Sequence, residues 1–236
     1  MKNYSEKFNN IYFSIFSIAF LYFLLFTSFY LVCFLDKNGL YKLIIEYKTY
    51  ENLPFSIDDS YLKTLASELM EYISGKLLFL ETKVPIDGVI TDFYSVRSKI
   101  HMADVRNIIV TLKNVNYVSM LLCIISLFKI INTENVIIKL KKIYIRTTII
   151  ITAALIIIFA FGLINFDSFF IKFHELLFTN DLWLLDPSED YIICLLPEKI
   201  FMTYGLRIVI AMIVSILFSV GLLQILSKIQ LRQEAK

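Results

Sequence analysis

The chain has 236 residues, of which 58% are hydrophobic and 19% are charged. Typical soluble domains contain about 45–50% apolar and about 25% charged residues, so this composition excludes an ordinary water-soluble domain. The mean hydropathy of +0.69 supports the same conclusion. A formal net charge of only +2 gives no reason to expect a nucleic-acid partner. We therefore expect an integral membrane protein.

Four stretches with almost no formal charge, residues 11–35, 112–131, 147–166 and 208–227, determine the expected topology. Each is close to the roughly 20 residues that a membrane-spanning helix needs. We expect a mainly α membrane protein, a four-transmembrane-helix bundle with a small extracytoplasmic cap built from two loops. The expected segments are an N-terminus with the first span (1–35), a first cap segment (36–107), a second span (108–131), a cytoplasmic loop (132–146), a third span (147–166), a second cap segment (167–207), a fourth span (208–227) and a cytoplasmic tail (228–236).

The distribution of basic residues orients this bundle, because short cytoplasmic connections retain Lys and Arg during insertion. Five basic residues stand against one acidic residue between positions 129 and 146, and the tail is basic too. The second cap segment has seven acidic and three basic residues. We therefore expect a multi-pass protein of the plasma membrane, with both termini cytoplasmic and both cap segments on the extracytoplasmic face.

The first span is expected to stay as a signal anchor, because it is long for a signal peptide and no small-x-small cleavage site follows it. Val32 is too large for the position before a lipidated cysteine, so Cys33 is not a lipidation site. Three cysteines give no framework of disulfides. Cys33 and Cys194 share the outer side and could pair, but we expect these two and Cys123 to be inert thiols.

Local patterns predict some structure in the cap. Residues 40–50 are typical of a strand or a short interfacial helix. Ser60 is a candidate cap for a helix over 61–73, which Gly75 would end. A second helix is expected to begin at Thr91 or Asp92 and to continue into the second span. Each cap segment alone has too little apolar surface for its own core, so we expect the two to fold together.

His101 lies on that second helix and shares a face with Asp104 and Asn116 at 3.6 residues per turn. Polar side chains near the membrane are costly and usually turn toward water or toward the bundle. The face is therefore a candidate site. Two alternatives remain open: His101 and Asp104 form only a local hydrogen bond, and Asn116 only joins helices.

The second cap segment carries the other histidine, His174, within a run of aromatic, amide and acidic residues. An interfacial aromatic belt would explain the rings alone, but not the polar groups among them. The candidate polar residues are His174, Asn180 and Asp181, and the candidate aromatic residues are Phe173, Phe178, Trp183 and Phe201.

Two motifs resemble the lipoprotein intramolecular transacylases (Lit) of low-GC Gram-positive bacteria. One is His101-Met102-Ala103-Asp104-Val105, which leads into the second span. The other runs from Phe173-His174 to Phe201 and includes Asn180-Asp181-x-Trp183, Asp186-Pro187 and Pro197-Glu198-x-x-Phe201. The resemblance covers most of the chain. It implies a four-helix bundle with an extracytoplasmic cap and two catalytic histidines, His101 and His174.

The implied reaction moves a fatty acyl group from the sn-2 position of an S-diacylglyceryl cysteine to the α-amine of the same cysteine. The product is an N-acyl lyso-form lipoprotein. A histidine with a pKa near 6.5 suits proton transfer from an amine with a pKa of about 8, and a second histidine can donate to the ester oxygen. Asp104, Asn180 and Asp181 would support the histidines. No cofactor or metal is expected, and the partners would be diacylglyceryl lipoproteins and membrane lipid.

Aromatic walls would orient the substrate and exclude water, which would otherwise hydrolyse the ester. The expected substrate-binding residues are Phe173, Phe178, Trp183, Phe201 and Asn116.

Two other classes of function stay open. His101, Asp104 and His174 could form a two-His, one-carboxylate metal site of an interfacial lipid hydrolase, although no His-Glu-x-x-His motif supports it. The chain could also be a non-catalytic membrane partner or a transporter. Transport is disfavoured because no acidic residue lies deep within a span.

Overall fold

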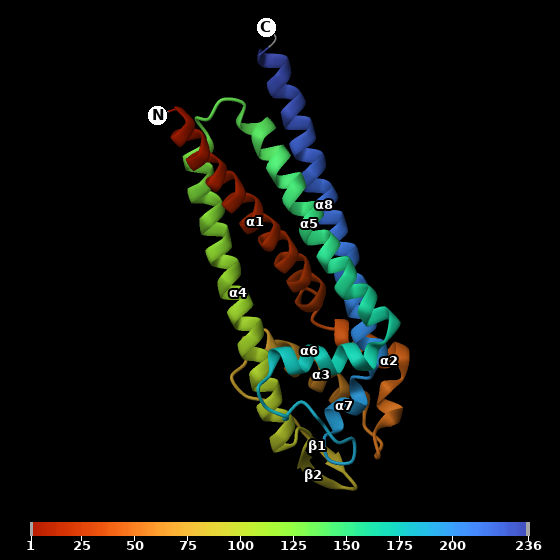
Figure 1. Ribbon diagram of the computed structural model, residues 1–236. Coiled ribbons are helices and arrows are strands. Elements are labelled where there is room, and N and C mark those ends of the chain that lie inside the picture. Colours follow the sequence, from red (N-terminus) through yellow and green to blue (C-terminus); the bar gives the residue numbers. More distant parts are fainter. Residues whose placement is uncertain (1, 235–236) are drawn as a thin grey trace. The chain divides into compact units, whose positions relative to one another are not determined.

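Helices account for most of the chain in the computed structural model, which describes residues 2–234 (Figure 1). In chain order the elements are α1 (Lys2–Phe34), α2 (Gly39–Tyr47), the short 3-10 helix η1 (Thr49–Asn52), α3 (Asp59–Ile73), β1 (Lys83–Ile86), β2 (Val89–Asp92), α4 (Val96–Ile130), α5 (Val136–Ile164), α6 (Phe166–Leu177), α7 (Tyr191–Leu195) and α8 (Glu198–Glu234). They fall into two compact units, described separately below. The second unit comprises Tyr30–Leu112 and Asn165–Ile208, and the first unit comprises the rest of the chain.

Four helices are long and apolar enough to cross a membrane: Asn9–Phe34, Val96–Ile130, Val136–Ile164 and Glu198–Gln233. The four predicted spans are therefore confirmed. At 1.5 Å per residue, the 35 residues of α4 extend about 52 Å, whereas the hydrocarbon core is only about 30 Å thick. Part of α4 must therefore lie outside the hydrocarbon, and its polar first turns fit there.

Small polar side chains join the helices of the first unit. Ser28 Oγ and Ser215 Oγ are 3.0 Å apart, and Tyr144 Oη and Ser219 Oγ are 2.7 Å apart. Small residues allow helices to approach closely in lipid, and hydrogen bonds between helices satisfy their polar groups there. A buried apolar cluster accompanies these contacts and comprises Phe13, Phe16, Ala19, Cys123, Ile130 and Leu140.

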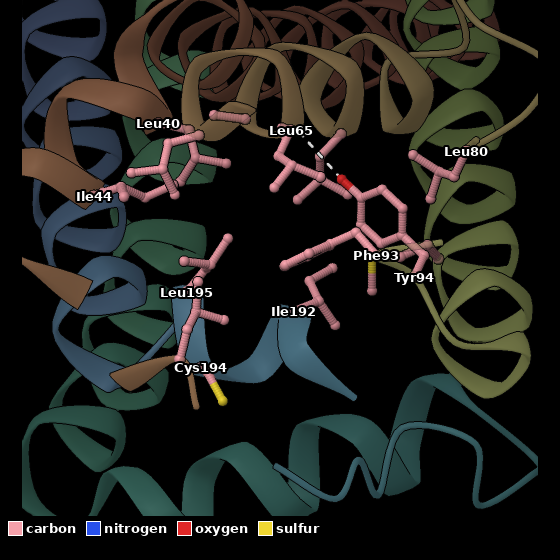
Figure 2. Packing of buried hydrophobic residues seen from close by; sticks show 14 of the residues in the cluster. Leu40, Ile44, Leu65, Leu80, Phe93, Tyr94, Ile192, Cys194 and Leu195 are labelled. Carbon is pink, nitrogen blue, oxygen red and sulfur yellow. Dashed lines mark hydrogen bonds between the residues drawn. The ribbon is translucent and has the colours of Figure 1, made fainter. Parts of the chain in front are cut away.

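The second unit has its own hydrophobic core, to which both of its chain segments contribute. Figure 2 shows Leu40, Ile44 and Leu65 from the first segment facing Ile192 and Leu195 from the second. Hydrogen bonds between the segments accompany the apolar packing: Thr49 Oγ1 donates to the Leu195 carbonyl at 2.9 Å, and Asn52 Nδ2 donates to the Cys194 carbonyl at 3.2 Å. The two segments therefore fold as one unit.

The start of α4 differs from the prediction. Thr91 and Asp92 lie in β2, and the helix begins at Val96. Ser95 Oγ accepts a hydrogen bond from the Ser98 amide at 3.0 Å, the usual role of an N-cap side chain. The strands before it form a hairpin in which Asp87 and Gly88 both have positive φ, at 50° and 82°. An Asp-Gly pair between β-branched residues is a strong hairpin signal, but no hairpin was predicted at these residues.

Of the two interpretations of residues 40–50, the short helix is the one observed, as α2. Two other boundaries differ as well. The helix over 61–73 begins at Asp59 after Asp58, so Ser60 is not its cap. The segment 132–146, expected as a loop, is mostly helical, because α5 already begins at Val136. All three cysteines are free thiols.

Candidate active site

The two histidines lie close together in the second unit. His101 is on the second turn of α4 and His174 is near the end of α6. Their ring centroids are 5.9 Å apart, and the residues are only 4% and 9% exposed. The helices thus bring together two side chains that are 73 positions apart in sequence, the difference between 174 and 101.

The protonation of His174 follows from a backbone contact. Its Nδ1 lies 2.7 Å from the carbonyl oxygen of Phe170, one turn earlier on α6. A carbonyl only accepts hydrogen bonds, so Nδ1 carries the proton and Nε2 of the neutral ring keeps a lone pair. Burial lowers the pKa of His174 below its ordinary 6.5, although the hydrogen bond to Phe170 opposes this shift. His174 is therefore neutral at pH 7.

His101 has a different environment. Its Nδ1 is buried and has no hydrogen-bond partner in the part of the chain that the structure describes. Asp104, one turn further along α4, accepts a hydrogen bond from Asn180 Nδ2 at 3.0 Å. Asn180 Oδ1 in turn accepts from the Leu182 amide at 3.1 Å. The carboxylate thus connects the His101 helix to the segment that follows α6.

Aromatic rings surround the two imidazoles. The centroid of His174 is 4.0 Å from that of Phe170, 5.0 Å from Trp183 and 5.7 Å from Phe173. Phe178 contacts both histidines, at 5.1 Å from His101 and 5.6 Å from His174. These rings make the surroundings of the imidazoles apolar.

Phe170 and Phe201 complete this arrangement. Phe170 was not among the predicted site residues, although its position four residues before His174 places both on one helical face. Phe201 packs against Phe170 at 6.2 Å and is thus one side chain removed from His174.

The other candidate polar residues are placed differently. The carboxylate of Asp181 is 78% exposed and lies 3.7 Å from the guanidinium of Arg97. Asn116 belongs to the first unit, where its carbonyl accepts a hydrogen bond from Ser119 at 2.7 Å. The structure therefore brings together His101, His174 and the aromatic rings, and it places Asp181 at the surface.

Nothing in the geometry forms a metal site. Within residues 2–234, no group of three His, Cys, Asp or Glu side chains is arranged to hold a metal ion. His101, Asp104 and His174 thus do not form the cluster that the metal-hydrolase alternative requires.

Solved structures share this fold. The chain matches an in meso structure of the membrane integral lipoprotein intramolecular transacylase Lit from Bacillus cereus with a TM-score of 0.73 at 23% identity, over 98% of this chain and 99% of that one. A variant of the Bacillus cereus protein with a histidine replaced by arginine matches with a TM-score of 0.69 at 21% identity, over 99% and 96% of the two chains. A variant with the histidine replaced by alanine gives 0.68 at 22%, over 99% and 98%.

None of the curated proteins compared with the chain matches it. A model of the family described as lipoprotein intramolecular transacylase Lit matches residues 14–201, which is most of the sequence. The resemblance inferred from the two motifs is confirmed, and so is a multi-pass membrane protein with a mainly helical fold. The chain belongs to the lipoprotein intramolecular transacylase Lit family.

Proposed function

We propose that this chain moves the sn-2 acyl group of an S-diacylglyceryl cysteine at a lipoprotein N-terminus to the α-amine of that cysteine. A bond forms between the amine nitrogen and the acyl carbon, and the ester bond to the glyceryl oxygen breaks. The amine proton replaces the acyl group on that oxygen. The product is the N-acyl lyso form, and no water or cofactor is consumed. The pairing of two buried imidazoles, 5.9 Å apart, carries this proposal.

His174 is assigned the role of general base. Its Nδ1 proton is committed to the Phe170 carbonyl, so the lone pair on Nε2 is available for a proton from the amine. The lowered pKa of His174, caused by burial, keeps the ring unprotonated near neutral pH. A free α-amine has a pKa of about 8, so only modest assistance is needed to keep it neutral.

His101 is assigned the role of donor to the ester oxygen as the tetrahedral intermediate forms and collapses. Its Nδ1 has no partner within the described residues, so a reacting group would not have to displace an existing hydrogen bond. Burial and then the neighbouring His174 lower the pKa of His101 to about 4, so the ring is neutral near pH 7 and donates through its N–H. The charge of Asp104, one helical turn away, partly opposes this shift. Asn180 holds that carboxylate through its 3.0 Å hydrogen bond. Proton transfers of this kind contribute about 10²- to 10⁴-fold.

The aromatic residues are assigned to substrate binding. Nucleophile and ester belong to one molecule, so the protein's main task is to fold the substrate until they meet, which can contribute roughly 7 to 11 kcal/mol. Phe173, Phe178 and Trp183 contact the imidazoles and would hold the glyceryl and acyl portions while excluding water. Phe201 would support Phe170, and Asn116 as a substrate-binding residue stays a prediction.

This reaction would take place on the extracytoplasmic face of the plasma membrane, with both chain termini in the cytoplasm. Diacylglyceryl-modified lipoproteins would be the substrates, in surrounding membrane lipid. The test is mass spectrometry of one lipoprotein's N-terminal peptide from cells with and without this chain. We expect the N-acyl lyso form only when the chain is present. An unchanged diacylglyceryl peptide in both samples would contradict the proposal.

A further inference from the structure

The segment between α6 and α7 carries Trp183, and few backbone hydrogen bonds within this segment fix the position of Trp183 against His174. The Leu184 amide donates to the Asp181 carbonyl at 3.0 Å, and the Leu185 amide donates to the Trp183 carbonyl at 3.0 Å. Residues 181–184, called here the Trp183 turn, contain no helix or strand. Nevertheless, Trp183 is 9% exposed, and its ring lies 5.0 Å from the imidazole of His174. The ring packs against Phe170 and His174, and hydrogen bonds from outside the turn can fix the backbone that carries it.

Arg97, on the first turn of α4, binds both ends of the Trp183 turn. Its Nε donates to the Leu184 carbonyl at 3.1 Å, and its Nη2 donates to the Asp181 carbonyl. These two carbonyls lie on either side of Trp183 in sequence. A guanidinium is a planar fork of fixed donors, so two such bonds determine the orientation of the turn as well as its distance.

We infer that Arg97 is a positioning residue, which fixes the Trp183 turn on α4 and thereby holds the indole against His174. Among the described residues, the hydrogen bonds of Arg97 go to the Trp183 turn and not to either imidazole, so we expect it to act through Trp183. The effect on catalysis rests on the proposed function, whereas the effect on the position of Trp183 does not.

The ion pair between Arg97 and Asp181 does not account for this role. Its 3.7 Å separation joins a carboxylate that is 78% exposed to a guanidinium that is 39% exposed. Exposed pairs of this kind contribute little, because water screens them. The contacts with the two backbone carbonyls are the specific ones, and a lysine could not reproduce both of them.

Trp183 itself supplies the measurement, since it is the only tryptophan in the chain. Its fluorescence in purified, detergent-solubilised protein reports on the turn alone. We expect wild-type emission to be blue-shifted, poorly quenched by acrylamide, and to change in intensity as His174 titrates. Arg97→Met should shift the emission to the red, raise quenching by acrylamide and weaken the dependence on pH.

The groups that face His174 make this pH dependence interpretable. From α4, the facing titratable group is His101. The rings of Phe170 and Phe173 on α6, and of Phe178 and Trp183 beyond it, do not titrate. On α6 itself, Lys172 and Glu175 are exposed and pair with each other at 2.7 Å. A His174→Asn variant identifies which histidine produces the change in emission.

Three further variants separate the possible causes of a changed Trp183 emission: loss of charge, loss of the ion pair and loss of the two carbonyl contacts. Lys99 lies two residues after Arg97 on α4, and its ammonium donates to Asp92 at 2.9 Å. Lys99→Met removes a positive charge without touching the Trp183 turn, so it should match the wild type in emission and rate. Asp181→Asn keeps both carbonyl acceptors and should keep the wild-type emission. Arg97→Lys keeps the charge but not the fork, and it should resemble Arg97→Met. If Arg97→Met does not fold, Arg97→Lys carries the test.

Turnover of a diacylglyceryl lipopeptide completes the experiment. Because small displacements near a reacting group can cost about 10²-fold in rate, Arg97→Met should lower kcat by about that factor with little change in KM. Wild-type emission in Arg97→Met, full restoration by Arg97→Lys, or the same changes in Lys99→Met would each overturn the inference. A shifted emission without any turnover in wild type would support the positioning role and contradict the proposed function.

Discussion

At the scale of single residues, the chemistry of the candidate site depends on how the two imidazoles differ. His174 has one nitrogen bound to a helix carbonyl, whereas the Nδ1 of His101 is buried without a partner within the described residues. Two rings with the same intrinsic pKa can therefore act as base and as donor, because their surroundings determine which nitrogen carries a proton. Substitution of each ring tests this division of roles.

We expect His101→Asn and His174→Asn each to abolish conversion of a diacylglyceryl lipopeptide to the N-acyl lyso form. Asparagine keeps polarity and approximate size but cannot exchange a proton near pH 7. The double variant should be about as inactive as either single variant, since both residues would act in one turnover. Asp104→Asn should keep partial activity. Mass spectrometry of the peptide measures conversion, and size-exclusion chromatography checks folding. Full activity in either histidine variant would reject the mechanism.

The pKa of His174 should lie below 6.5 in the folded protein, because burial lowers it. With only two histidines, NMR of ¹³C-labelled imidazoles gives one resonance for each, and His174→Asn assigns them. Trp183→Ala should raise the pKa of His174 toward 6.5 by admitting water. A pKa of His174 above 6.5 in the wild-type protein would contradict the assignment of a buried neutral base.

The dependence of turnover on pH then has a defined sign. The amine and the base must both be unprotonated, so the rate should fall as pH falls. Between about pH 8 and the pKa of His174, only the amine gains a proton, and log kcat/KM should fall with a slope of about one. Below the pKa of His174 the slope should steepen to about two. A single slope throughout would show that His174 is not the base.

Chelation separates the transacylase from the metal-hydrolase alternative. No group of three metal-binding side chains occurs within residues 2–234, so we expect turnover to persist after dialysis against EDTA. Activity that is lost in EDTA and restored by zinc would favour the alternative instead.

At the scale of elements, the start of α4 is attached to the segment after α6 at two places besides the Trp183 turn. Ser95 Oγ donates to a carboxylate oxygen of Asp190, which is only 2% exposed. The other carboxylate oxygen of Asp190 accepts from the Asp186 amide at 2.9 Å. Further along α4, Asp104 binds Asn180. These bonds keep the His101 helix beside the chain that carries the aromatic rings.

Ser95→Ala should lower the free energy of unfolding by about 1–3 kcal/mol, because it removes the N-cap bond to the Ser98 amide and leaves the buried carboxylate of Asp190 short of a donor. Ser188→Ala is the matched control. Ser188 Oγ also donates to an aspartate, Asp186, at 2.7 Å, but in an exposed turn, so its loss should cost less than about 0.5 kcal/mol. Thermal unfolding in detergent measures both. Equal effects of the two substitutions would show that neither the N-cap bond nor the bond to Asp190 stabilises the fold.

The sequence predicted the membrane spans better than it predicted where individual helices and strands begin and end. The four spans followed from apolar runs, which need no knowledge of packing. The hairpin at Asp87-Gly88 was recognisable from a local signal, and Phe170 from its spacing to His174, but neither was selected. The contacts of Arg97 with the Trp183 turn could not be predicted, because they join segments 84 and 87 positions apart through the fold of the second unit. Proximity of the two histidines was expected from the mechanism that the family resemblance implies and, separately, from the metal-site alternative.

At the scale of the whole molecule, the membrane topology follows from the fact that the second unit is made of two separate chain segments. Its two segments end within α4 and α8 respectively, and they share one hydrophobic core. Two segments that fold together must emerge on the same side of a membrane. An even number of spans between them satisfies this, since the chain crosses through α4 and returns through α5. The packing thus requires a common side, and only the choice of side depends on the basic residues.

The charge distribution predicts that this common side is extracytoplasmic, because the connection between α4 and α5 and the early turns of α5 are basic. Lys139 on α5 and Glu189 in the second unit report on opposite sides of the membrane. In a variant with Cys33, Cys123 and Cys194 replaced by serine, Glu189→Cys should react with a membrane-impermeant maleimide on intact cells. Lys139→Cys should react only after the membrane is permeabilised. The reverse pattern would place the two histidines in the cytoplasm, where a transacylase acting on exported lipoproteins could not meet its substrate.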